Sequence, residues 1–191
     1  TQILKFNSMI RNENERMNKY VERILLQAKL DRREVHLKKV PVNLNVLVDE
    51  AVEHFRLQVE EKGGVIRAEL DPEGYVMSAD EVHMLNVVCN LIDNAIKYSH
   101  DSLNIYIYTK QEGNRFIIGV RDTGIGIPKE AQDKVFKRFY RVPSGNLHNV
   151  KGFGLGLSYA KSIVELHGGE IQLTSKKNKG TLVEIIFKME S

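Results

Sequence analysis

The stretch RDTGIGIP, Arg121–Pro128, decides how the whole chain is interpreted. It follows NRFIIGVRD, a run whose branched and aromatic residues predict a strand. The strand then meets an acid, two glycines one residue apart and a proline. Glycine supplies unusual backbone angles and proline ends regular structure, so a plain turn explains the stretch as well as a binding loop does. Other segments of the chain have to distinguish these two interpretations.

The composition is that of an ordinary globular protein. The 191 residues, 42% hydrophobic and 28% charged, predict one full domain plus a smaller element. No apolar run approaches the roughly 20 residues that a membrane span needs, and no charged-then-apolar leader begins the chain. The single cysteine, Cys89, lies in an apolar context and fits a reducing compartment. We therefore expect a cytoplasmic region without a membrane segment.

The charge is mild overall but uneven along the chain. A formal net charge of +3 is too small for a nucleic-acid-binding protein, so we expect no nucleic acid partner. Residues 129–161, however, carry seven lysines and arginines against two acidic residues. A basic surface beside glycine-rich loops suits a polyphosphate ligand, although scattered solvated lysines would give the same count.

The first 35 residues contain no glycine or proline, and apolar residues recur there at near-heptad spacing, broken at Glu13. These apolar residues are Ile3, Phe6, Ile10, Met17, Tyr20, Ile24 and Ala28. The pattern predicts a long amphipathic helix that packs on another helix, from a partner chain or from a part of the protein outside this chain. After the charged run DRREVHLKK, Pro41 ends the pattern, so we divide the chain into domains 1–40 and 41–191.

The second domain predicts helices and strands in mixed order. Helices are expected over residues 44–64, 79–99 and 157–169, and strands over 64–70, 74–78, 102–110, 115–122, 170–176 and 181–189. Adjacent hairpins with helices grouped between them indicate an α+β sandwich, a mixed and mostly antiparallel sheet with helices on one face. Ser78 followed by Glu81 resembles a capping box that starts the second helix.

Polar residues gather on one side of the helix over 79–99. At about 100° per residue, Asn90, Asn94 and Lys97 lie nearly opposite the apolar residues. Those apolar residues are Leu85, Val88, Ile92 and Ala95. A plain solvent face is one explanation. Because asparagine is a weak helix former, two of them one turn apart before a lysine also predict oxygen ligands and a cation for phosphate.

A third cluster is KGFGLGLS, where Gly152, Gly154 and Gly156 alternate just before a helix. Backbone amides at a helix N-terminus make an anion site, a weak signal by itself. The cluster matches neither G-x-x-x-x-G-K-S/T nor G-x-G-x-x-G, because residue 157 is leucine. The chain also lacks the H-R-D and D-F-G motifs of eukaryotic-type protein kinases.

Five segments follow one another in a characteristic order: NLIDNAIKYS, DTGIGIP, VFKRFYR, GFGLGL and KGT. They resemble the N, G1, F, G2 and G3 boxes of the sensor histidine kinases. The resemblance covers residues 42–188, which are similar to the catalytic ATP-binding domain, and implies a Bergerat-type ATP-binding fold. Residues 1–40 resemble the second helix of the dimerisation and phosphotransfer hairpin. The family further implies Mg²⁺ and ATP as cofactors, a homodimer through the N-terminal helix, and a response-regulator receiver domain as partner.

The resemblance assigns binding roles to individual residues. Asp122 would accept a hydrogen bond from the adenine amino group, which guanine lacks at that position. Asn94 would be the Mg²⁺ ligand through its amide oxygen, with Asn90 lining the same site. The other positions that would bind nucleotide are Lys97, Tyr98, Gly124, Gly126, Ile127, Phe139, Arg141, Gly152, Gly154, Leu155, Gly156 and Thr181. Residues 142–151 would form the ATP lid, and Phe136 and Phe139 would pack against it or inside the core.

The catalytic set implied by the family is Asn90, Lys97 and Arg141, the latter two contacting phosphate. In the ATPase relatives, such as gyrase, the position of Asn90 carries a glutamate that activates water. An amide cannot act as a general base, so transfer to a protein side chain is favoured over hydrolysis. A histidine imidazole is itself a nucleophile, which leaves positioning and charge stabilisation to this domain.

One expected feature is missing. The family carries its phosphoacceptor histidine in a motif such as HELRTPL, and none of the six histidines lies in one. They are His36, His54, His83, His100, His148 and His167. We therefore expect a fragment that lacks the acceptor helix, with His167 in a packing or capping role. Two alternatives stay open: a non-catalytic nucleotide-binding dimerisation module, and an anti-sigma-factor serine kinase, which shares the fold but usually lacks the long leading helix.

Overall fold

The structure, a computed structural model, describes residues 2–31, 34, 36–99, 103–142 and 153–189. The chain divides into two compact units, residues 1–37 and 38–191. Among the described residues, no helix is both long and apolar enough to cross a membrane. The two units are described separately.

The first unit is the helix α1 (Gln2–Asp31), which confirms the long helix expected from the sequence. Large apolar side chains on it are more than half exposed: Phe6, Met9, Ile10, Met17, Val21 and Leu25. A single helix of this kind gains little stability by itself, because most helical stability in proteins comes from packing of the apolar face. The apolar face of α1 therefore fits a helix that pairs with another helix.

The second unit is built on a five-stranded sheet in the order β2-β4-β5-β7-β6. Its strands are β2 (Val65–Glu69), β4 (Asn104–Glu112), β5 (Arg115–Asp122), β6 (Glu170–Lys176) and β7 (Gly180–Lys188). The pair β2 and β4 is parallel and the other neighbours are antiparallel. This confirms the mixed, mostly antiparallel sheet predicted from the sequence.

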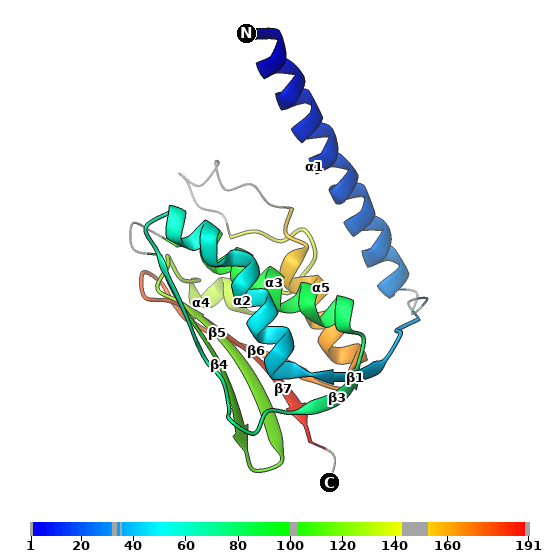
Figure 1. Ribbon diagram of the computed structural model, residues 1–191, viewed down its shortest axis with the longest axis vertical. Coiled ribbons are helices and arrows are strands. Elements are labelled where there is room, and N and C mark those ends of the chain that lie inside the picture. The colour runs from blue at the N-terminus through cyan, green and yellow to red at the C-terminus, as the bar shows by residue number, and fades with distance from the viewer. Residues whose placement is uncertain (1, 32–33, 35, 100–102, 143–152, 190–191) are drawn as a thin grey trace. The chain divides into compact units, whose positions relative to one another are not determined.

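Helices cover one face of this sheet, as Figure 1 shows. They are α2 (Leu44–Glu61), α3 (Glu81–Lys97) and α5 (Gly156–Leu166), with a short helix α4 (Lys129–Gln132) after β5. The core lies between the layers, where Ile118 pairs with Ile185 and Phe116 with Phe187, all fully buried. Each such side chain contributes about 1.5–3 kcal/mol by leaving water. The alternation of buried and exposed residues along β4 fixes which face of the sheet meets the helices.

A small second sheet pairs β1 (Val40–Asn43) with β3 (Val76–Ala79). The sequence predicted β3 but not β1, because β1 has four residues and contains Pro41. Proline is tolerated in this two-stranded sheet, where it lies opposite Ser78. Pro41 therefore lies inside regular structure rather than interrupting it.

The predicted capping box at the start of α3 is wrong. Ser78 is still paired within β3, so the strand ends later than the motif requires. The N-cap is Asp80, whose Oδ1 accepts a hydrogen bond from the backbone N–H of His83 at 3.1 Å. A short carboxylate two residues further on thus performs the capping that the sequence assigned to the serine.

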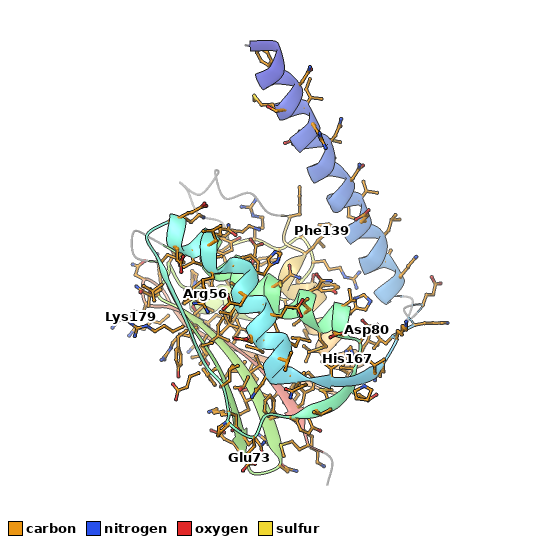
Figure 2. The ribbon with its side chains drawn as sticks, viewed as in Figure 1. Arg56, Glu73, Asp80, Phe139, His167 and Lys179 are labelled. Atoms are coloured by element: carbon orange, nitrogen blue, oxygen red, sulfur yellow. The ribbon has the colours of Figure 1, made fainter. Side chains whose placement is uncertain are left out.

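Asp80 also joins the start of α3 to the end of α5, as Figure 2 shows with His167. The Asp80 amide donates to His167 Nε2 at 2.9 Å, and His167 Nδ1 donates to the Ile163 carbonyl at 2.8 Å. Asp80 Oδ2 accepts from the Lys38 amide at 2.8 Å. Because an amide only donates and a carbonyl only accepts, His167 must be neutral with its proton on Nδ1. The packing role expected for His167 is the one the structure shows.

This arrangement predicts a pH-dependent stability. Burial lowers the pKa of His167 below its ordinary value, so the unfolded chain binds a proton more readily than the folded one. The neutral His167 ring therefore contributes its full stability above the pKa that His167 has in the unfolded chain. This contribution is lost as the pH falls through the lower pKa that His167 has in the folded protein. In urea unfolding at pH 7.5 and 5.5, we expect the wild type to lose stability at the lower pH and the His167→Gln variant to lose less.

The matched control is His54→Gln, since His54 is exposed on α2. This variant should keep the pH dependence of the wild type. Equal losses in the wild type and in His167→Gln would show that the buried ring does not titrate in this range.

Candidate functional site

The candidate site is organised around Asp122, the last residue of β5. In the sheet register Asp122 lies opposite the buried Ile105, which places it on the helix-covered side. Its Oδ1 accepts two backbone hydrogen bonds, from Gly124 at 2.8 Å and from Thr181 at 3.2 Å. No described residue donates to the other oxygen, Oδ2. One half of the carboxylate is therefore fixed by the protein and the other half remains an acceptor.

The electrostatic environment of Asp122 follows from this geometry. Burial raises the pKa of the carboxyl above its ordinary value, and the two amide hydrogen bonds from Gly124 and Thr181 oppose that effect. A half-buried acceptor oxygen without a donor is costly. A ligand N–H at Oδ2 would satisfy the oxygen and favour the ionised carboxylate.

The loop after Asp122 explains why the strand runs into two glycines. A Cβ at Gly124 would lie 2.2 Å from the Tyr98 carbonyl oxygen, and a Cβ at Gly126, where φ is +63°, would lie 2.1 Å from the Lys176 carbonyl oxygen. The loop is held on both sides, since Ile125 N donates to Tyr98 O at 3.0 Å and Ile125 O accepts from Asn178 N at 2.7 Å. The atoms that require glycine here belong to the protein backbone. The loop is thus packed between the end of α3 and the β6–β7 hairpin.

Two residues that hold this loop were missed from the sequence, Ser175 and Gln132. Ile127 N donates to Ser175 Oγ at 2.8 Å, and Gln132 Nε2 donates to the carbonyls of Ile127 at 2.9 Å and of Ser175 at 2.8 Å. Neither residue belongs to a recognisable motif. The hydrogen bonds of Ser175 with Ile127 and Gln132 join residues that are 48 and 43 positions apart in the sequence. The local sequence pattern therefore does not predict these hydrogen bonds.

The helix α3 contributes a second group of polar side chains. A Cβ at Gly156, the first residue of α5, would lie 3.5 Å from Asn90 Oδ1 and 3.7 Å from Asn94 Nδ2. The structure therefore brings Asn90, Asn94 and Gly156 together, as the order of motifs predicted. Within the described residues neither asparagine side chain makes a hydrogen bond. Two half-buried amides without partners, beside a helix N-terminus, are suited to a polar ligand.

Lys97 is paired within its own helix, to Asp93 Oδ2 one turn earlier. Both side chains are about one-third exposed. Sequence reasoning missed Asp93, although an acid four residues before a lysine is a recognised helical pair. Tyr98 is the C-cap of α3, and its carbonyl accepts the Ile125 amide. Tyr98 therefore connects the asparagine-bearing helix to the loop after Asp122.

Four of the remaining predicted residues, Phe139, Arg141, Gly154 and Leu155, flank residues 143–152 in the sequence. Gly152 lies outside the described residues, as does most of the predicted lid, residues 142–151. Phe139 has φ +59° and its ring is 58% exposed, so the alternative of core packing is wrong for this residue. Its amide donates to the Gly154 carbonyl at 2.9 Å. Leu155 is the buried N-cap of α5, and Arg141 is exposed.

These residues fit an adenine nucleotide better than a resident metal ion. Among the described residues, Oδ2 of Asp122 has no donor, which an amino group on a base would supply. The side chains of Asn90 and Asn94 likewise have no partner among them, and both lie near a helix N-terminus. In the part of the chain that the structure describes, no group of three His, Cys, Asp or Glu side chains could hold a metal. An ion at Asn94 would therefore need oxygens from the ligand itself, as Mg²⁺ bound with a nucleotide has.

Comparison with known proteins identifies the family. Residues 79–191 match the family model of histidine kinase-, DNA gyrase B- and HSP90-like ATPases. Among curated proteins, the sensor protein RprX of Bacteroides fragilis is 41% identical over 177 residues, covering 92% of this chain and 34% of RprX. The chain spans about a third of the length of the curated relatives it matches.

Solved structures share the fold. The histidine kinase ThkA in complex with the response regulator protein TrrA is 25% identical, with a TM-score of 0.73, over 95% of this chain and 50% of that chain. Full-length ShkA in complex with AMPPNP has a TM-score of 0.85 at 20% identity, over 100% of this chain and 40% of that chain. The second likeness supports the fold alone.

The chain belongs to the family of histidine kinase-, DNA gyrase B- and HSP90-like ATPases. Within this family it is the catalytic ATPase domain of a two-component sensor histidine kinase. The Bergerat-type α+β sandwich expected from the five boxes is thereby confirmed.

The packing of the loop predicts how glycine substitutions rank in stability. Gly126→Ala and Gly113→Ala both place a side chain at positive φ, +63° and +60°. At Gly113 a Cβ meets nothing within 4 Å, whereas at Gly126 it meets the Lys176 backbone. By urea unfolding, Gly126→Ala should therefore lose about 1–3 kcal/mol more than Gly113→Ala, the usual cost of overpacking. Equal losses would mean that the hairpin moves aside without resistance.

Proposed function

We propose that this chain binds ATP with Mg²⁺ and transfers the γ-phosphoryl group to a histidine on a dimerisation helix outside the chain. That phosphoryl group is then relayed to an aspartate of a response regulator. The observation that carries the proposal is the carboxylate of Asp122, anchored at Oδ1 by Gly124 and Thr181 and without a donor at Oδ2 among the described residues. Membership of the ATPase family supports it, as does the AMPPNP bound by ShkA, a protein of the same fold.

In this proposal Oδ2 of Asp122 accepts a hydrogen bond from the amino group of adenine. Guanine carries a carbonyl oxygen at that position, which would face the carboxylate with no proton between them. Discrimination of this kind can be large, because the disfavoured base leaves a buried polar group unpaired. The nearby residues Tyr98, Ile127 and Thr181 complete the surroundings of the base.

The phosphate end of the site is assigned to α3 and to the N-terminal end of α5. Asn94 would hold Mg²⁺ through its amide oxygen, and Asn90 would line the same site. The backbone of Gly152, Gly154, Leu155 and Gly156, with Phe139 beside it, would face the phosphates. Lys97 and Arg141 would offset the negative charge of the phosphates. To do so, Lys97 would have to leave its ion pair with Asp93 and pair with phosphate instead. Bound Mg²⁺ would supply the charge neutralisation that phosphoryl transfer requires.

The identity of residue 90 favours transfer over hydrolysis. An asparagine amide has no basic lone pair at neutral pH, so Asn90 cannot remove a proton from water. An imidazole nitrogen needs no such base, since its lone pair can form the N–P bond as ADP leaves. The domain would then contribute positioning and charge stabilisation.

The partners follow from the same proposal. The apolar face of α1, with Phe6, Ile10 and Met17 exposed, would pair with a second copy in a homodimer. Residues 1–40 would be the second helix of the dimerisation hairpin and its linker, and residues 41–191 the ATP-binding domain. A response-regulator receiver domain is the proposed phosphoryl acceptor, as TrrA is the protein bound to ThkA. We place this region in the cytoplasm, where ATP is present.

Replacing Asp122 by Asn tests the adenine contact. The amide oxygen can keep the bonds to Gly124 and Thr181, which turns the NH₂ group toward the amino group of adenine, donor against donor. Calorimetric affinity for ATP should fall by about 1.5–3 kcal/mol, the size of a hydrogen bond to a charged group. Asp133→Asn, an exposed residue after α4, is the matched control and should bind like wild type. Unchanged affinity in Asp122→Asn would contradict the assigned role.

The transfer reaction is tested in a longer protein that includes the histidine-bearing helix. Incubation with ATP radiolabelled in the γ-phosphate should yield protein label that is stable to base and labile to acid, as phosphohistidine is. Asn94→Ala should lose the label through loss of Mg²⁺ binding. ATP binding without any label would instead support the non-catalytic dimerisation module.

A further inference from the structure

The hydroxyl of Ser175, near the end of β6, makes every hydrogen bond that a hydroxyl can make. Its Oγ donates to the Gly180 carbonyl at 2.9 Å. It accepts from the Ile127 amide at 2.8 Å, and it lies 3.0 Å from Thr181 Oγ1. Because its only proton is used toward Gly180, Thr181 must be the donor in the last contact. One side chain thus joins the loop after Asp122 to the start of β7.

The bond to Gly180 reaches Asp122 through a single peptide unit. The carbonyl of Gly180 and the N–H of Thr181 belong to the same planar peptide group. Ser175 Oγ donates to the oxygen of this peptide group, which is the Gly180 carbonyl. The N–H of the same group, that of Thr181, donates to Oδ1 of Asp122 at 3.2 Å. Because the group is planar, fixing the direction of its oxygen also fixes the direction of its N–H. A hydrogen bond to the oxygen also polarises the peptide group, which makes the N–H a stronger donor.

The same peptide is packed against Asp122 without spare room. Gly180 is buried with φ +95°, and a Cβ there would lie 1.9 Å from the Asp122 carbonyl oxygen. The other amide bonded to the carboxylate is that of Gly124, in the loop after β5. Three residues further along this loop, the Ile127 amide donates to Ser175 Oγ. Both amides that orient the carboxylate therefore lie in segments bonded to Ser175.

We propose that Ser175 is a positioning residue for base selection: its hydroxyl holds the two segments whose amides aim the carboxylate of Asp122. The inference rests on the proposed role of Asp122 in binding adenine. It goes further by assigning selectivity to a side chain that does not itself touch the base. Gln132 supports the same loop through the carbonyls of Ile127 and Ser175, but neither carbonyl belongs to the peptide between Gly180 and Thr181, so Gln132 does not join the two segments in this way.

The test compares calorimetric affinities for ATP and ITP in the presence of Mg²⁺, because hypoxanthine has a carbonyl where adenine has its amino group. The wild type should prefer ATP. In Ser175→Ala the ratio of the two affinities should fall about two- to tenfold, the range of one neutral hydrogen bond. Thr174→Ala is the matched control, since Thr174 is the exposed neighbour on the opposite face of β6. Its ratio should equal that of the wild type.

A merely structural role predicts a different result: the melting temperature without nucleotide falls while the ATP to ITP ratio stays that of the wild type. That result overturns the inference. If Ser175→Ala does not fold, Ser175→Cys is measured instead, where a weakly bonding thiol should give a smaller reduction of the ratio, and an unreduced ratio again overturns it. A wild type without preference for ATP would refute the role of Asp122 and the inference together.

Discussion

The carboxylate of Asp122 is oriented by amides from two segments that are far apart in the sequence. Gly124 follows it in the next loop, and Thr181 is the second residue of the last strand, 59 residues later. Each amide satisfies one lone pair of the same oxygen, and the other oxygen is left without a donor among the described residues. A carboxylate held in this way cannot rotate to bring Oδ2 to a protein donor, so Oδ2 is directed at a ligand. At Gly124 and Gly180 a Cβ would lie within 2.2 Å of a backbone carbonyl oxygen, so these positions have no room for a side chain.

We assign the other end of the site to phosphate, where the polar side chains of α3 differ in their contacts. The side chains of Asn90 and Asn94 make no hydrogen bond to any described residue, whereas Lys97 is paired with Asp93. Amides without partners lose little when a metal and phosphate arrive, but the lysine must give up an existing ion pair. Because that pair is partly exposed, its net contribution is small and phosphate can compete for the lysine. In the proposed function, the base therefore meets a fixed acceptor, whereas the phosphates meet groups that still have to rearrange.

Much of the fold could be predicted because the periodicity of the chain is strong. The helix α3 and the hairpin of β4 and β5 follow the apolar pattern closely, and the core pairs such as Ile118 and Ile185 come from it. The strand β1 was missed because its four residues are too few for a period and include a proline. The capping box failed since Ser78 remains in its strand, a pairing that the local sequence does not reveal.

The candidate site divides in the same way. Asp122, Asn94 and Gly156 belong to ordered motifs, so the resemblance to a family located them from the amino-acid sequence alone. Ser175 and Gln132 could not be located, because their hydrogen bonds depend on the register between β6 and the loop after β5. The resemblance assigned Gly124 and Gly126 to nucleotide binding, and the structure adds that the atom nearest to a Cβ at either position is a protein carbonyl oxygen. Motifs thus identify the groups that meet the ligand, and tertiary contacts decide what holds those groups in place.

We propose that Oδ2 of Asp122, which has no donor among the described residues, selects an adenine nucleotide. The most direct test of this proposal is the melting temperature of the domain with ATP and with GTP, each with Mg²⁺. If ATP reaches 100 times its dissociation constant, it should stabilise the domain by about 2.7 kcal/mol and raise the melting temperature by roughly 5–10 °C. GTP at the same concentration should leave it nearly unchanged. Equal shifts with both nucleotides, or none with ATP, would contradict the account.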